Sequence, residues 1–178
     1  MSILLHVNRL LRRLSLVGFL AASLLLLFIG LMGTADIVLT NLFNRPIPGV
    51  VELSGALLAV TVFLGLAEAQ ARGSHIVIDV ATAAMRPRMH KLAAMFSLSM
   101  GLVFMGFVAW QTTGLAIKAY GYGELALGAL PFPLTPFKAL AAFGAWLSAA
   151  EFARQLAIRV VTPPDTPVSS GPEGSDNA

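Results

Sequence analysis

Residues 14–35 read LSLVGFLAASLLLLFIGLMGTA, an apolar stretch without a single charged side chain. A helix needs roughly 20 mainly apolar residues to cross the hydrocarbon core of a bilayer, so this stretch predicts a membrane-spanning helix. Gly33-Thr34-Ala35 offers the small-x-small pattern of a signal-peptide cleavage site. The apolar run is nevertheless longer than the about 7–15 residues of a signal core, and we expect an uncleaved span.

Three more stretches have the length and apolar character of spans, at about residues 50–70, 92–117 and 134–158. Only 12% of the 178 residues are charged and 57% are hydrophobic. A soluble domain of this size usually carries about 25% charged residues. The sequence therefore predicts an all-α integral membrane protein with four transmembrane helices in one membrane domain, residues 1–161. Pro136 falls in the first turn of the fourth span, where a missing amide donor costs little.

Lysine and arginine are distributed unequally between the two sides of such a bundle. Nine of them lie before the first span, between the second and third spans, or at the C-terminal end of the fourth span, and three lie in the first connection or around the third. Cytoplasmic segments of membrane proteins carry the excess of positive charge. We therefore expect both termini and the second connection to be cytoplasmic.

The two ends of the chain have their own patterns. Residues 1–14 place polar and apolar side chains at helical spacing, which is typical of an amphipathic helix lying in the cytoplasmic interface. A frayed basic leader that only orients the first span explains the same residues, because the segment is short. Residues 162–178 are rich in Pro, Ser, Gly and acidic residues, and we expect a disordered cytoplasmic tail.

Composition also excludes several classes of function. The chain has no cysteine, which removes disulfides, thiolate metal sites and thiol catalysis. Its basic residues are dispersed at span ends and form no clustered basic face, so we expect no nucleic acid partner. No nucleophile, base and orienting group converge at one membrane depth. We expect no enzyme, no catalytic residue, no metal ligand and no bound cofactor.

Polar residues leave the second span at regular intervals. Glu68, Arg72, His75 and Asp79 are three or four positions apart in the stretch EAQARGSHIVID, residues 68–79. Residues with that spacing share one face of a helix, so Glu68 with Arg72 and His75 with Asp79 form i, i+4 pairs if the helix continues. The segment predicts an interfacial helix along the cytoplasmic surface, or a solvated loop whose charges fix topology. Ser74 is placed to cap a short second helix.

These residues resemble the small membrane subunit of tripartite ATP-independent periplasmic (TRAP) transporters, the DctQ-like family. The similarity is most specific at residues 72–79, RGSHIVID, which look like the family pattern R-x-x-H-I-x-x-D. Supporting it are Asp36, Glu52 at the entry of the second span, and Phe63-Leu64-Gly65. The tryptophan often found before the second span of the family is missing here. The resemblance makes five residues candidate structural or subunit-interface positions: Glu52, Glu68, Arg72, His75 and Asp79.

The resemblance implies a small permease subunit in the bacterial inner membrane. Its partners would be the lipid bilayer, a large TRAP membrane subunit, and a periplasmic solute-binding protein that delivers a carboxylate-type solute. A sodium gradient would drive uptake, with the ion sites on the large subunit. We expect this chain to enlarge and anchor the fixed wall against which the transport domain moves. Small residues such as Gly18, Gly55, Gly101 and Gly144 favour the close helix contacts of such a scaffold.

Two alternatives come from other classes of protein. A haem-b membrane anchor of an oxidoreductase holds haem between histidines on its spans. His6, His75 and His90 all fall at or beyond the ends of the predicted spans, which argues against haem. A small homo-oligomeric membrane transporter would need polar groups in mid-span, and the spans offer only a few, such as Thr61 and Gln111.

Overall fold

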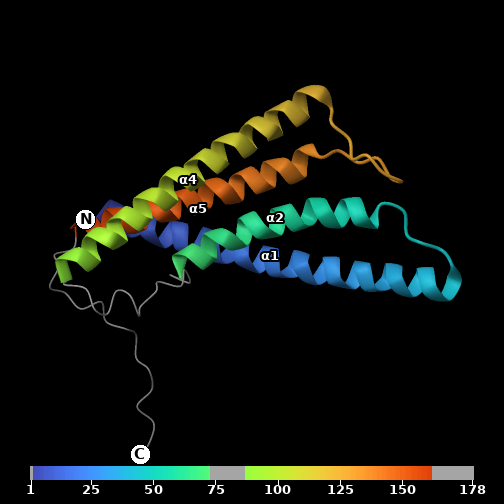
Figure 1. Cartoon of the computed structure of the whole chain (residues 1–178), viewed down its shortest axis with the longest axis horizontal. Coiled ribbons are helices and arrows are strands. Elements are labelled where there is room, and N and C mark those ends of the chain that lie inside the picture. Colours follow the sequence, from blue (N-terminus) through green and yellow to red (C-terminus); the bar gives the residue numbers. More distant parts are fainter. Residues whose placement is uncertain (1, 73–86, 162–178) are drawn as a thin grey trace, which may run out of the picture.

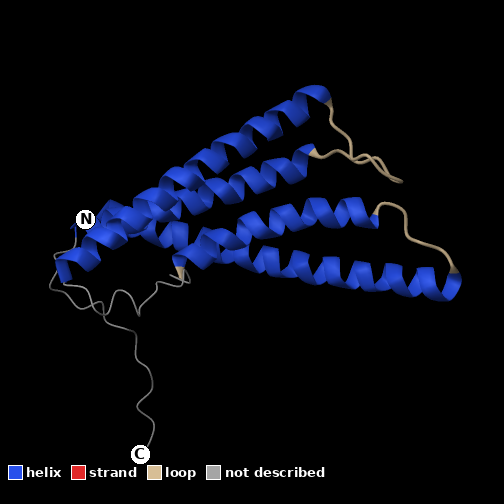
Figure 2. Cartoon of the chain, in the orientation of Figure 1, coloured by secondary structure: helices blue, strands red, loops and turns tan. Residues whose placement is uncertain are grey.

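The computed structural model describes residues 2–72 and 87–161 and consists of four long helices. They are α1 (Ser2–Phe43), α2 (Val50–Ala71), α4 (Pro87–Tyr122) and α5 (Thr135–Val161). Figure 2 shows helices joined by short loops, and the described residues contain no strand beyond an isolated bridge between Leu125 and Pro133. The all-helical fold class is confirmed. The connection between α2 and α4, including His75 and Asp79, and the tail from residue 162 lie outside the described residues.

The helices form two hairpins, α1 with α2 and α4 with α5, and α5 lies between α4 and α2 (Figure 1). The four helices converge where α1 begins and α5 ends, which we name the terminal end. The hairpins diverge toward the loops formed by residues 44–49 and 123–134, which we name the loop end (Figure 1). Contacts between the hairpins are therefore concentrated toward the terminal end.

Three helices have the length and apolar composition to span a membrane, over Leu10–Phe43, Val50–Ala71 and Leu92–Tyr122. The fourth predicted span is a helix, α5, but it does not reach the same apolar character. It carries Lys138, Glu151, Arg154 and Arg159. Because α5 is packed between two other helices, much of its surface meets protein rather than lipid, and fewer apolar side chains are needed there.

Local sequence explains where the helices stop. Asn44 follows α1 with a left-handed φ of 51°, and its N–H bonds to the carbonyl of Thr40 at 3.0 Å. Gly123 follows α4 with a left-handed φ of 61°, and its N–H bonds to the carbonyl of Tyr120 at 3.3 Å. Glycine, which has no β-carbon, tolerates this conformation best and asparagine tolerates it better than most residues, and it commonly ends a helix. α4 begins with Pro87, whose missing N–H costs nothing in a first turn.

The helices run past the predicted span boundaries. α1 is continuous from Ser2, so the N-terminal segment and the first span form a single helix. At 1.5 Å per residue its 42 residues extend about 63 Å, twice the roughly 30 Å of a hydrocarbon core. Whether its first residues lie in the membrane interface stays a prediction.

Small residues allow the helices to approach closely. A β-carbon on Gly144 of α5 would lie 2.6 Å from the backbone carbon of Phe63 in α2. One on Gly101 of α4 would lie 2.2 Å from the ring of Phe152 in α5. Gly18 of α1 faces the Leu64 carbonyl of α2 at 3.6 Å. Three of the four glycines expected at helix contacts are therefore found there, whereas the fourth, Gly55 on α2, has nothing within 4 Å.

Candidate functional site

Polar side chains gather at the terminal end, where α1, α2 and α5 meet. Burying such groups among apolar helices costs free energy unless they are paired. We name them the polar cluster. Ser15, Glu68, Gln70, Ser148 and Glu151 are buried, and Arg72, Arg154 and Gln155 contact them.

Helix register places several of these residues at a similar depth. Gly18 lies against Leu64 of α2 and Leu147 of α5, which fixes one level of the bundle. Moving one turn toward the terminal end leads to Ser15, Glu68 and Glu151 on the three helices, because α1 runs opposite to α2 and α5. Residues 136 and 83 positions apart in the chain are thus placed at one level.

Glu68 and Arg72 form the ion pair expected from their spacing. The Arg72 Nε donates to Glu68 Oε1 at 2.9 Å, with the Glu68 side chain 8% exposed and that of Arg72 58% exposed. The guanidinium also lies over the Phe19 ring of α1, 5.4 Å from its centroid. Such cation–π contacts stabilise a cation against an aromatic face. The pair therefore ties the end of α2 to α1, while its role at a subunit interface stays a prediction.

Two glutamines join α2 to α5. Gln70 Nε2 donates to Gln155 Oε1 at 3.0 Å, and Gln155 Nε2 donates to the Gln70 carbonyl at 2.6 Å. Gln155 Nε2 also lies 3.1 Å from Glu151 Oε1. Reciprocal amide bonds of this kind fix both the separation and the register of two helices.

Glu151 is the most deeply buried charge described. Its side chain is 1% exposed, and Arg154 donates to both carboxylate oxygens, with the Nε bond to Oε2 measuring 2.8 Å. Charged side chains near the end of a span commonly extend to the water interface, but Glu151 does not. The neighbouring arginine and the Gln155 amide satisfy the carboxylate inside the bundle. Lys138, at the other end of α5, pairs with Glu124 at 2.5 Å.

Four buried oxygens of the cluster keep free hydrogen-bonding capacity. Within the described ranges, Ser15 Oγ, Ser148 Oγ, Glu68 Oε2 and Gln70 Oε1 have no hydrogen-bond partner. Such atoms are suited to binding ordered water. The described residues include no group of three or more His, Asp or Glu that could hold a metal ion. The carboxylates of the cluster are paired with arginines, and its glutamines bond α2 to α5, so the cluster is suited to holding helices together.

Glu52 lies far from the cluster, at the loop end of α2. A β-carbon on Gly128 would overlap the Glu52 carboxylate at 1.8 Å, so the loop 123–134 crosses directly over the start of α2. Asp36 acts nearby, accepting a hydrogen bond from the Ile47 N–H at 2.7 Å. Of the three candidate residues that the structure describes, Glu52, Glu68 and Arg72, it brings Glu68 and Arg72 together.

Gln70, Gln155, Ser15 and Ser148 were not singled out from the sequence. Gln155 follows Glu151 by one turn, and this i, i+4 pair of polar residues late in an apolar helix was an available signal. Nothing in the sequence indicates that Gln70 faces Gln155, which is 85 positions away.

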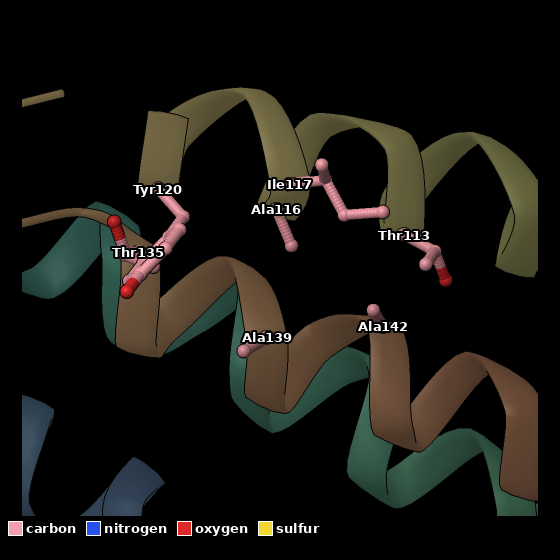
Figure 3. Close-up of a pocket in the computed structure, with 7 residues that line it drawn as sticks. All are labelled: Thr113, Ala116, Ile117, Tyr120, Thr135, Ala139 and Ala142. Atoms are coloured by element: carbon pink, nitrogen blue, oxygen red, sulfur yellow. The ribbon is translucent and has the colours of Figure 1, made fainter. Parts of the chain in front are cut away.

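An apolar groove of about 360 Å³ lies between α4 and α5. Figure 3 shows its lining, with Ala116, Ile117 and Tyr120 from α4 facing Thr135, Ala139 and Ala142 from α5. Near it, Trp146 Nε1 donates to Thr113 Oγ1 at 3.0 Å and joins the two helices. The groove offers no pair of acid and base, and its surface is that of two diverging helices.

The fold and the cluster together define a multi-pass helical membrane protein whose buried polar groups connect its own helices. The chain belongs to the DctQ component family of the tripartite ATP-independent periplasmic transporters, because the model of that family matches residues 29–162. The match covers residues 29–43 of α1 and the whole of α2, α4 and α5, and it confirms the resemblance. This is a family of transporter components rather than of enzymes. No curated protein and no solved structure matches the chain.

Proposed function

We propose that the chain is the small permease subunit of a TRAP transporter and scaffolds the large membrane subunit. The observation that carries the proposal is the use of its buried polar groups. Gln155 joins α5 to Gln70 of α2, and Glu68 and Glu151 are each paired with an arginine of the same helix segment, so these groups leave little for binding a solute. A braced bundle suits a part that stays fixed while another domain moves.

In this proposal α5 is the fourth membrane span. Its low hydropathy is compatible with crossing because Glu151 is neutralised inside the bundle and Lys138 pairs with Glu124 near the loop end. The excess of basic residues puts both termini in the cytoplasm of a bacterial cell and the loop end in the periplasm. The loops 44–49 and 123–134 would then face the solute-binding protein.

The energy source in this proposal is a sodium gradient, and the solute is a carboxylate delivered by the binding protein. We assign the ion sites to the large subunit, because the two carboxylates found buried among the described residues are already engaged by Arg72 and Arg154. This chain then contributes no cofactor and no ion ligand.

Uptake by proteoliposomes tests the proposal. The large subunit is reconstituted with or without this chain, the binding protein loaded with a labelled carboxylate is added outside, and an inward sodium gradient is imposed. We expect uptake only when both membrane subunits and the gradient are present. Equal uptake by the large subunit alone would refute the scaffold function.

Two glycine variants test in the same assay whether uptake depends on the intact packing of this chain or only on its being present. Gly144→Ala disturbs the contact of α5 with α2, whereas Gly106→Ala meets nothing within 4 Å. We expect Gly144→Ala to lower uptake in proportion to the amount of intact complex and Gly106→Ala to leave it unchanged. Uptake that stays at the wild-type level with a disrupted bundle would count against the scaffold.

A further inference from the structure

On one side of α4, largely exposed residues recur at intervals of seven positions along the span. A first row consists of Ser97, Phe104, Gln111 and Lys118, all exposed. A second row, three residues on, consists of Met100, Phe107 and Gly114. We name these two rows the α4 seam. A spacing of 3.5 residues on average is that of helices packed along one another, and this seam carries apolar Met100, Phe104 and Phe107 among polar or small residues.

The other described helices do not pack on the seam. The residues by which α4 packs on α5 are others, with Met105 packed in a buried cluster with Ala149 and Phe152 of α5. Met100, Phe104 and Phe107 each remain more than 60% exposed. At 100° per residue the seam lies on the side of α4 that faces away from α5. Either lipid or another protein must cover it.

Gln111 distinguishes between these two coverings. It is exposed, and its amide forms no hydrogen bond with any other described residue. The span Leu92–Tyr122 is centred near residue 107, so Gln111 lies about 6 Å from the middle of the span and inside a core roughly 30 Å thick. Hydrocarbon offers no hydrogen bond, and a polar group there costs free energy unless a protein group meets it.

The exposed face of α1 provides the contrast. An exposed row on α1 with the same seven-residue period has only aliphatic side chains, namely Leu10, Val17, Leu24, Leu31 and Val38. That surface is as apolar as a lipid tail and needs no partner. The α4 seam instead combines two aromatic rings, an amide and Gly114, a position where nothing lies within 4 Å and a second backbone can approach.

Lys118 indicates that the partner presents negative charge at the loop end of the seam. It is exposed at the loop end of the seam and forms no ion pair within the described parts of the chain. A complementary helix carries a hydrogen-bonding side chain opposite Gln111. It carries a carboxylate, or its own C-terminal end, opposite Lys118, since either attracts a cation.

We propose that the α4 seam binds a transmembrane helix of the large subunit, with Gln111 as its central hydrogen-bonding residue. The inference rests on the proposed function, which supplies a large membrane subunit as partner. It goes further by selecting one face of one helix.

Photo-cross-linking tests the seam in the assembled complex. A benzoylphenylalanine is placed at Phe104 or Phe107 in the seam and, as matched controls, at Leu24 or Leu31 in the aliphatic row of α1. We expect the seam positions to cross-link to the large subunit at least fivefold more than the control positions. Equal cross-linking at both faces, or cross-links from the seam to a second copy of this chain, would overturn the inference.

A substitution gives an independent measure. Gln111→Leu should reduce the large subunit retained during purification by about threefold to tenfold, the range of one hydrogen bond between membrane helices. Thermal unfolding of the isolated chain should be unchanged, because the Gln111 side chain has no hydrogen-bond partner among residues 2–72 and 87–161. Full retention by Gln111→Leu contradicts the seam. Wild-type chain that retains no large subunit contradicts the proposed function instead.

Discussion

Substituting Gly144 with alanine tests the closest helix contact in the bundle. The new β-carbon would lie 2.6 Å from the Phe63 carbonyl carbon, 2.7 Å from its oxygen and 2.8 Å from the Leu64 nitrogen. All three atoms belong to the backbone of α2 and cannot rotate away. An ordinary contact is at least 3.4 Å, so α2 and α5 must separate by about 0.8 Å at this point.

Overpacking of this kind usually costs about 1–3 kcal/mol. Alanine is intrinsically better than glycine in a helix by roughly 0.5–1 kcal/mol, which offsets part of the cost. We therefore expect Gly144→Ala to lower the free energy of unfolding by about 0.5–2 kcal/mol. Separation of the two helices also stretches the bonds between Gln70 and Gln155.

The assay is reversible unfolding in mixed detergent and SDS micelles, followed by the fluorescence of Trp110 and Trp146. Gly55→Ala is the matched control, since it adds the same methyl group to α2 where nothing lies within 4 Å. The control should be unchanged or stabilised by up to about 1 kcal/mol. If Gly144→Ala is as stable as Gly55→Ala, the close approach of α5 to α2 is not as described.

Three more predictions concern the polar contacts. Gln155→Leu should destabilise the chain by about 1–2 kcal/mol, and adding Gln70→Leu should cost less than its own single effect, as a double-mutant cycle by SDS unfolding will measure. Glu151→Ala should destabilise more than any single glutamine change, by about 2–4 kcal/mol in the same assay, because it strands a cation in the bundle. Trp146→Phe and Thr113→Val should each lower the unfolding midpoint modestly and by similar amounts. The double variant should lose little more, because both substitutions remove the same hydrogen bond.

Apolar length was sufficient to predict the helices but not their ends. The stretch at residues 14–35 marks what a bilayer must cover, whereas α1 continues to Phe43 because nothing breaks the helix before Asn44. α5 has a helical sequence, yet its four charged residues leave it less apolar than the other helices. Whether such a helix crosses a membrane depends on how its charges are paired, which hydropathy does not include.

Local spacing likewise predicted one part of the polar cluster. Glu68 and Arg72 are one turn apart, so their ion pair follows from helix geometry alone. The bond between Gln70 and Gln155 depends on the packing of α2 against α5, which no local pattern specifies. The burial of Glu151 was missed for the same reason, since a charge near the end of a span is more often exposed to water.

The mass of the purified membrane complex tests the central claim most directly. Native mass spectrometry of the large subunit co-expressed with this chain should give one assembly that exceeds the large subunit alone by one copy of this 18.8 kDa chain. Loss of that increment in Gln111→Leu, with Leu24→Ala unaffected, would also place the contact on the α4 seam. A large subunit that appears alone, beside a separate homo-oligomer of this chain, would contradict the account.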